Sequence, residues 1–159
     1  MIIRKISKET KLQVFQYKVL HQIIPTQLFL YRAKISESPV CKICKMSNEN
    51  VEHMLYDCES TKNTWLNLIV LFEQRESIEV QCNTKSCLFG IFSKNNEKQK
   101  WNYVSLLFRY YIYRTKSNNQ TINLSVFLQS FKCHLNLKSL TYQSENEQED
   151  FDKQWEKWM

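Results

Sequence analysis

Four residues between positions 41 and 58 have the types and the spacing of a metal site. Cys41-Lys-Ile-Cys44 is followed by His53 and Cys58, which gives the pattern C-x2-C-x8-H-x4-C. Structural zinc sites take four tetrahedral nitrogen and sulfur ligands, and a Cys-x2-Cys turn delivers two thiolates from one knuckle of backbone. Four protein ligands leave no position open for an activated water. The pattern therefore predicts a structural zinc ion and disfavours a catalytic one.

The chain around His53 and Cys58 must bring two ligands five residues apart to the same ion. We expect a short helical turn from Val51, followed by a non-helical bend. Two alternatives remain at this point. In the first, Cys41 and Cys44 are buried small hydrophobic residues and His53 lies on a helix. In the second, the two cysteines form a redox pair, which is typical of a helix N-terminus in a βαβ unit. The other cysteines have no spacing that fixes a second metal and are interpreted as structural: Cys82, Cys87 and Cys133.

Composition excludes several classes of site. The chain has 159 residues but only one glycine, Gly90, and two prolines. Phosphate-cradling and dinucleotide-binding loops need several closely spaced glycines, so we expect no nucleotide cofactor. Few glycines and prolines favour helices over tight hairpins. No apolar run approaches the roughly 18 residues of a membrane span, and the first residues become charged too early for a signal peptide. An intracellular location, in the nucleus or the cytoplasm, is expected.

Apolar periodicity predicts the elements that must position these residues. A helix is expected over about 12–24, ending near Pro25, and a shorter one capped by Thr26 and ending before Ser36. Ser60 or Thr61 is the expected cap of a third helix, which continues to about residue 72. Residues 74–95 form a connector with one short apolar element at 88–92. Further helices are expected over about 96–116 and 124–140, with a pattern compatible with continuation to residue 158.

These elements predict a mainly α fold, a helical domain with an inserted CCHC zinc knuckle. Residues 1–75 hold the first helices and the knuckle, and residues 76–95 connect them to a second part. Residues 96–159 are expected to form a helical C-terminal region that packs on the first part.

Charge is distributed unevenly along the chain, whose formal net charge is +6. Residues 1–35 hold seven basic side chains and one acid, and residues 98–116 hold five basic side chains and no acid. By contrast, residues 145–156 hold six acids and one base. Adjacent basic segments would form a surface for phosphate, although ordinary solvated helix faces give the same pattern. The expected phosphate contacts are Arg4, Lys5, Lys11, Lys18, Arg32, Lys42 and Lys45.

The ligand segment resembles the zinc-binding region at the C-terminus of non-LTR (LINE-type) retrotransposon reverse transcriptases. Its most specific part is the run Glu52-His53-Met-Leu-Tyr-Asp-Cys58. The resemblance extends over residues 15–26, 29–32, 38–44, 51–58 and 65, and more weakly over 88–90, 110–114 and 151–155. It implies that Cys41, Cys44, His53 and Cys58 bind zinc, and that the region helps to hold RNA or DNA for a polymerase domain.

The chain departs from that family in one respect that bears on activity. It has no aspartate before Asp57 and no Asp-Asp pair, whereas a polymerase needs paired metal-binding aspartates. The C-terminal acids follow no strand pattern and are interpreted as a solvated tail, so no nuclease and no enzyme is predicted. We expect a non-catalytic zinc module that binds RNA or DNA. The alternatives are a scaffold module that docks on a polymerase domain and an inert retrotransposon remnant.

Overall fold

The computed structural model describes residues 7–81, 83–91, 95–144 and 148–159, and most of these residues are helical. They contain no β-strand, only an isolated antiparallel bridge between Val40 and Asn48. The predicted mainly α fold class is therefore confirmed. No described helix is both long and apolar enough to cross a bilayer.

Two compact units make up the chain, Met1–Ile122 and Asn123–Met159. The first contains α2 (Thr10–Leu20), α3 (Gln27–Arg32), the π-helical turn η1 (His53–Asp57), α4 (Glu59–Glu76), α5 (Thr84–Phe89) and α6 (Asn96–Ser117). The division differs from the expected boundary at residue 95. The helix after that boundary, α6, belongs to the first unit because its aromatic residues form the centre of that unit's core.

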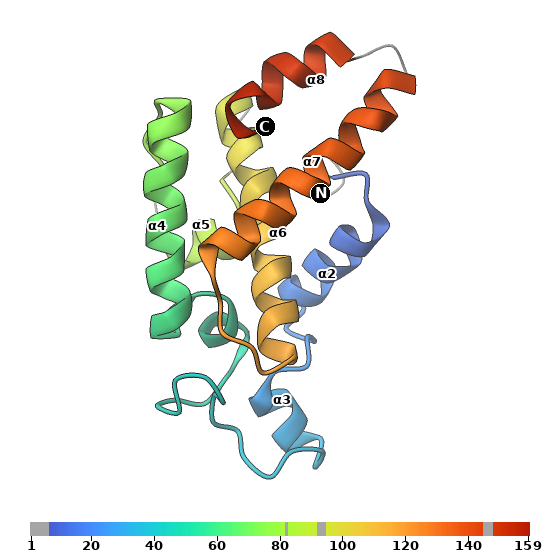
Figure 1. The fold of residues 1–159 in the computed structure, drawn as a ribbon. Helices are drawn as coiled ribbons and strands as arrows, with labels where there is room; N and C mark the ends of the chain where they lie inside the picture. The colour runs from blue at the N-terminus through green and yellow to red at the C-terminus, as the bar shows by residue number, and fades with distance from the viewer. Residues whose placement is uncertain (1–6, 82, 92–94, 145–147) are drawn as a thin grey trace. The chain divides into compact units, whose positions relative to one another are not determined.

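The core of the first unit lies where α4 runs alongside α6 (Figure 1). Trp65 of α4 packs edge-on against Phe108 of α6, with ring centroids 4.6 Å apart, and Phe72 packs against Trp101 at 5.0 Å. On α2, Phe15 contacts Tyr110 at 5.3 Å. Burial of side chains of this size supplies roughly 2–3 kcal/mol each, so this aromatic layer is a large apolar contribution to the stability of the unit.

Three helices of this unit end with the same two features, a residue in the left-handed conformation that glycine favours and a hydrogen bond from the amide that follows it. Gln22, Lys34 and Asn119 have φ of 54°, 59° and 54°. In each case the next amide closes the helix on the carbonyl five residues before it, as Ile23 does on Lys18 at 2.9 Å. This termination ends α2 at Leu20, earlier than the expected end near Pro25.

Side-chain caps set two of the helix starts. Thr26 accepts a hydrogen bond from the amide of Phe29 at 3.2 Å, which confirms the expected cap of α3. Asn83 and Ser86 form a reciprocal capping box that begins α5, where only a connector with an apolar element at 88–92 was expected. Phe92 lies outside the described residues. The expected cap of α4 was wrong, because that helix begins at Glu59, directly after Cys58, without a side-chain cap.

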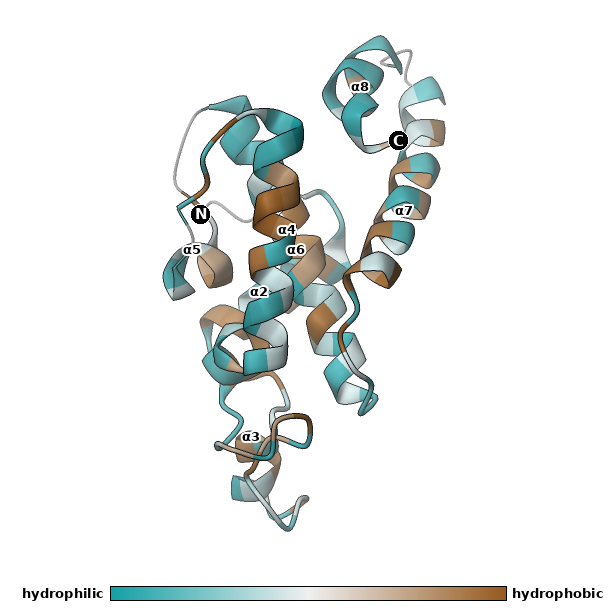
Figure 2. Ribbon diagram, turned by 60° about the vertical axis from the view of Figure 1, so that its left-hand side comes forward, coloured by the Kyte–Doolittle hydropathy of each residue, from teal (hydrophilic) through white to brown (hydrophobic). Residues whose placement is uncertain are grey.

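The second unit consists of α7 (Leu124–Ser144), α8 (Gln148–Trp155) and the 3-10 turn η2 (Glu156–Trp158). Phe131 of α7 meets Trp155 and Trp158 edge-on, with centroids 5.8 and 5.5 Å apart. Figure 2 shows α8 as mostly hydrophilic, whereas hydrophobic and hydrophilic residues alternate along α7. Aromatic anchors on one side of α8 thus hold an otherwise acidic helix against α7.

Gly90, the single glycine, ends α5 with a φ of 82°. A Cβ at this position would lie 2.7 Å from Oδ1 of Asn102, which itself accepts a hydrogen bond from the amide of Ile91 at 2.6 Å. Replacing Gly90 by Ala is therefore expected to lower the free energy of unfolding by about 1–3 kcal/mol. Equilibrium denaturation in urea with excess zinc measures this change.

Ser77→Ala is the matched control, since Ser77 also sits beyond a helix in the left-handed region but already carries a Cβ. It should change the stability by no more than about 0.5 kcal/mol. Equal effects of the two substitutions would show that neither the φ nor the contact with Asn102 constrains Gly90.

Candidate metal centre

A short backbone hairpin presents the first two cysteines. The amide of Glu49 donates to the carbonyl of Pro39 at 2.8 Å, and that of Cys41 donates to Ser47 at 2.9 Å. Inside this hairpin the amide of Lys45 closes a turn on the carbonyl of Cys41 at 2.9 Å. Cys41 and Cys44 therefore leave one tight turn together, which is the geometry that the Cys-x2-Cys spacing predicts.

The second pair of ligands flanks the π-helical turn η1. The amide of Cys58 donates to the carbonyl of His53 at 3.0 Å, a hydrogen bond over five residues. In an α-helix, residues five apart point about 140° away from each other. The wider π turn places Cys58 next to His53 along one hydrogen bond instead. A helical turn ending in a bend was expected here, but its π geometry was not.

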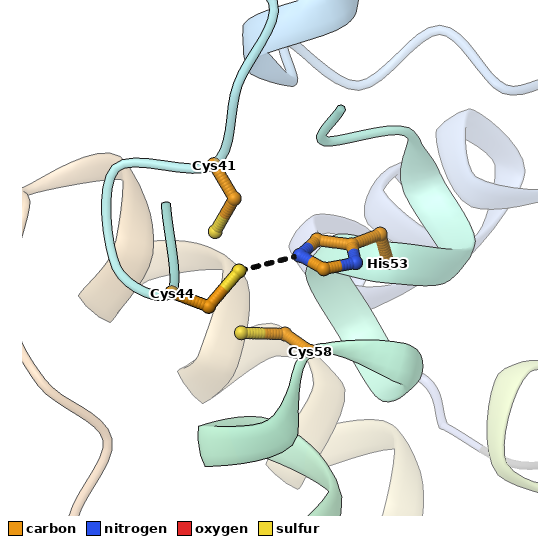
Figure 3. Close-up of side chains that lie close together, drawn as sticks. All are labelled: Cys41, Cys44, His53 and Cys58. Carbon is orange, nitrogen blue, oxygen red and sulfur yellow. Dashed lines mark hydrogen bonds between the residues drawn. The ribbon is translucent and has the colours of Figure 1, made fainter. Parts of the chain in front are cut away.

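The four side chains converge on one point (Figure 3). Their ligand atoms all lie within 4.8 Å of one another, and Sγ of Cys44 is 3.3 Å from Nε2 of His53. Zinc–sulfur bonds of about 2.3 Å in a tetrahedron separate the ligand atoms by about 3.8 Å. The set of donors and their spacing therefore fit a tetrahedral zinc ion. Cys41 and Cys58 are fully buried, while Cys44 and His53 are half-buried.

Protonation of the cluster is set mainly by burial. Burial raises the pKa of the Cys41 thiol to about 12, so zinc must displace its proton on binding. For His53, burial and then the nearby charge of Lys116 lower the pKa, which keeps the imidazole neutral and able to bind a metal at pH 7. Burial alone would raise the pKa of Cys44, but hydrogen bonds from neighbouring groups, first the amide of Met46, lower it overall.

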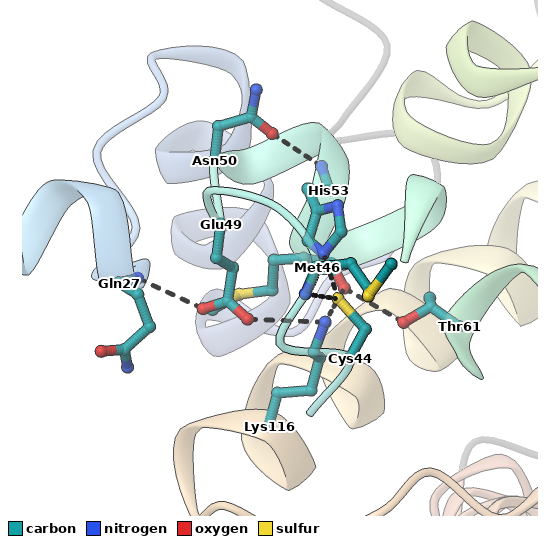
Figure 4. Close-up of polar contacts among 9 residues, drawn as sticks. Gln27, Cys44, Met46, Glu49, Asn50, His53, Thr61 and Lys116 are labelled. Atoms are coloured by element: carbon teal, nitrogen blue, oxygen red, sulfur yellow. Dashed lines mark hydrogen bonds and ion pairs between the residues drawn. The ribbon is translucent and has the colours of Figure 1, made fainter. Parts of the chain in front are cut away.

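A buried ion pair lies beside the cluster (Figure 4). Nζ of Lys116, near the end of α6, is 3.5 Å from Oε2 of Glu49 and donates to the carbonyl of Met54 in η1 at 3.3 Å. The other carboxylate oxygen of Glu49 accepts from the amide of Gln27, the first residue of α3, at 3.2 Å. This pair thus joins the hairpin, the π turn, α3 and α6.

The basic residues predicted as phosphate contacts are exposed wherever the structure describes them: Lys11, Lys18, Arg32, Lys42 and Lys45. Arg4 and Lys5 lie outside the described residues. Lys11 also forms an ion pair with Glu9 at 3.4 Å, in which its own side chain is 60% exposed. Lys42 and Lys45 flank the cysteines of the hairpin.

Five basic residues between positions 98 and 116 were expected to contribute to an exposed surface. This expectation is wrong for three of them. Lys100 pairs with Glu76 at 2.8 Å, Arg109 is 1% exposed, and Lys116 belongs to the buried pair. Arg109 donates to the carbonyl of Cys87 at 2.7 Å, and although burial lowers its pKa to about 9, it stays charged at pH 7. These cations point inward because they bind carboxylates and carbonyls of other segments. Lys98 and Arg114 retain exposure.

Among the described residues, the other two cysteines, Cys87 and Cys133, take no part in the cluster. Cys87 is buried, Cys133 is exposed, and Cys82 lies outside the described residues. The part of the chain that the structure describes holds no second group of cysteine, histidine and acidic residues of this kind.

A helical fold built around a Cys3His cluster defines a zinc-binding domain. Residues 2–65 match the sequence model of the family described as zinc-binding in reverse transcriptase. The match spans 64 of the 159 residues and includes all four residues of the cluster. This segment is therefore a reverse transcriptase zinc-binding domain, which confirms the resemblance at the level of reverse transcriptases. No curated protein and no solved structure matches the chain.

Cys58→Ser is expected to release zinc and to destabilise the first unit, because structural zinc in small domains supplies apparent binding free energy on the order of 10 kcal/mol. Metal analysis of the purified protein and thermal unfolding measure the two effects. Cys133→Ser, at an exposed cysteine outside the cluster, should keep one zinc per chain. A Cys58→Ser protein with full zinc content and an unchanged Tm would show that Cys58 is not a ligand.

Lys116→Met is expected to destabilise the protein by about 3–5 kcal/mol, because it leaves the buried Glu49 carboxylate without its cation. The double variant Lys116→Met/Glu49→Gln should recover most of this loss, since a neutral amide can still accept from Gln27. Urea denaturation of both single variants and the double variant gives the coupling energy. Additive effects of the two substitutions would mean that the pair does not connect α6 to the metal centre.

Proposed function

We propose that this chain is a non-catalytic zinc-binding module that binds RNA or DNA, derived from the C-terminus of a non-LTR reverse transcriptase and working inside the cell. The observation that carries the proposal is the charge of the segment that leads to the zinc cluster. Between positions 10 and 36 the chain has Lys11, Lys18, Arg32 and Lys34 and no acid. All four side chains are exposed, so this segment offers positive charge to a polyanion.

The zinc ion in this proposal organises the protein and does not itself bind phosphate. Three thiolates and a neutral imidazole around Zn²⁺ carry a net charge near −1, which repels an anion. The exposed cations on the hairpin, Lys42 and Lys45, supply the attraction instead. By fixing the hairpin, the metal holds these two side chains in place beside it. Four protein ligands also leave no position for a reacting water.

A docking role on a polymerase domain is the second candidate function. It is supported by Leu66 and Val70, which lie one turn apart on α4 and are 46% and 52% exposed. Exposed apolar side chains at this spacing suit a helix or sheet of a partner protein. Such an interface depends little on salt, which separates it from binding of a polyanion.

Fluorescence anisotropy of a labelled single-stranded RNA, titrated with the zinc-loaded protein, tests the proposal. If Lys11, Lys18, Arg32, Lys42 and Lys45 each contact a phosphate, raising the salt from 50 to 200 mM should weaken binding of the single strand roughly 100-fold. Lys11→Glu/Lys18→Glu should lower the affinity at low salt by at least about tenfold. The control Lys62→Glu/Lys132→Glu changes the net charge equally at exposed positions elsewhere.

Equal losses in the two double variants would mean that net charge, and not the segment before the zinc cluster, accounts for binding. Absence of binding at low salt would overturn the nucleic-acid proposal for this chain and leave docking on a polymerase domain as the candidate.

A further inference from the structure

Helix α2 has one face in the core and one face in solvent. Leu12, Phe15 and Val19 are at most 3% exposed, and Phe15 packs against Tyr110 and Tyr113 of α6. The opposite face carries side chains three or four residues apart, which places them in one row along the helix. This exposed row consists of Lys11, Val14, Tyr17, Lys18 and His21.

An aromatic pair occupies the exposed row. The rings of Tyr17 and His21 have centroids 4.2 Å apart and are tilted by 45°, and the Tyr17 side chain is 52% exposed. The pair holds the tyrosine ring in a defined orientation while half of its surface stays in contact with water. A preoriented aromatic face in solvent is what an unpaired base stacks on, whatever its sequence.

Two cations lie on the same exposed face as this aromatic pair. Lys18 adjoins Tyr17 and makes no ion pair within the described part of the chain. Lys11 lies two turns earlier, roughly 10 Å along the helix axis. Its ion pair with Glu9 is exposed and therefore weak, so a phosphate can replace the carboxylate. The row combines stacking with positive charge and has no acid of its own.

We infer that the exposed row of α2 binds a single-stranded polynucleotide, with a base stacked on Tyr17 and phosphates at Lys11 and Lys18. This inference rests on the proposed function and narrows its ligand from nucleic acid in general to strands with unpaired bases. A duplex offers the same phosphates but hides the faces of its bases in the helical stack. Contact with Tyr17 therefore favours the single strand, while the lysines serve both forms.

The same combination recurs on α3. Phe29 and Tyr31 are 42% and 48% exposed, and Arg32 follows them in an exposed position. Exposed aromatic rings next to cations, twice within a segment free of acids, suit a polyanion with flat bases better than an apolar protein surface. If these rings instead contacted a protein partner or a second copy of the chain, binding of nucleic acid would show no preference for unpaired bases.

Tyr17→Leu tests the inference, since leucine keeps apolar bulk and helix propensity but removes the aromatic face. Anisotropy titrations of the zinc-loaded protein with a single-stranded RNA and with its duplex form compare the two ligands. Tyr17→Leu should weaken binding of the single strand by about 5- to 150-fold, the range for loss of one stacked base, and leave the duplex unchanged. Tyr17→Phe keeps the ring and should bind like the natural protein.

Lys18→Ala serves as the contrasting variant. It should weaken both ligands by similar factors and reduce the salt slope for the single strand by about 0.7, as loss of one phosphate contact does. A 2-aminopurine base in the single strand gives a direct readout, because stacking on an aromatic ring quenches its fluorescence. The quenching should persist in Tyr17→Phe and disappear in Tyr17→Leu.

Two outcomes would overturn the inference while leaving the proposed function intact. One is salt-dependent binding of the single strand that Tyr17→Leu does not weaken, and the other is an equal loss on the single strand and the duplex. Failure of the natural protein to bind either form at low salt would instead contradict the proposed function itself. Capture of a second protein copy in place of RNA, seen as dimerisation that Tyr17→Leu abolishes, would assign the row to self-association.

Discussion

The buried ion pair between Glu49 and Lys116 is the contact on which the arrangement of the first unit depends. The hairpin that carries Cys41 and Cys44 has only one β-bridge and a few backbone hydrogen bonds of its own. Glu49 connects it to the start of α3, and Lys116 connects it to α6 and to the π turn. A buried charge without its partner costs several kcal/mol. The positions of the hairpin, the π turn, α3 and α6 therefore depend on one another.

Zinc and this pair would constrain the same two segments, the hairpin and the π turn. The metal centre has a net charge near −1 when its three thiolates are ionised, and Lys116 acts electrostatically on both Cys41 and His53. A buried cation at this place offsets part of the negative charge of the centre, whereas Glu49 opposes it. The carboxylate of Glu49 accepts a hydrogen bond from the amide of Gln27, and the indole of Trp65 donates to the carbonyl of Leu55 at 2.7 Å. These contacts connect the centre to the helical core. Metal binding and packing of the core are thus coupled through defined contacts.

Sequence patterns predicted the parts of this structure that depend on neighbouring residues. The convergence of the Cys3His cluster, the Thr26 cap and the span of α6 follow from spacing, cap chemistry and apolar periodicity. The pair Asn83 and Ser86 has the spacing of a capping box, which signals a helix start, but only a connector was predicted at that place. The inward direction of Lys100, Arg109 and Lys116 could not be predicted in this way. Periodicity places charge in solvent by default, and their partners lie 22 to 67 positions away in sequence.

Because Lys100, Arg109 and Lys116 of α6 point into the protein, α6 exposes less positive charge to solvent than its sequence indicates. Lys100 and Lys116 are matched by Glu76 and Glu49, so both pairs contribute little to the field outside the protein. In the C-terminal segment, residues 145–156 have six acids and only one base, so this part of the sequence carries net negative charge. Exposed positive charge in a stretch without acids runs from α2 through α3, and the lysines of the hairpin follow it, while Arg114 and Lys132 are exposed on α6 and α7. Because zinc and the Glu49–Lys116 pair fix that hairpin, the contacts that stabilise the fold also hold Lys42 and Lys45 at the surface where we propose that a polyanion binds.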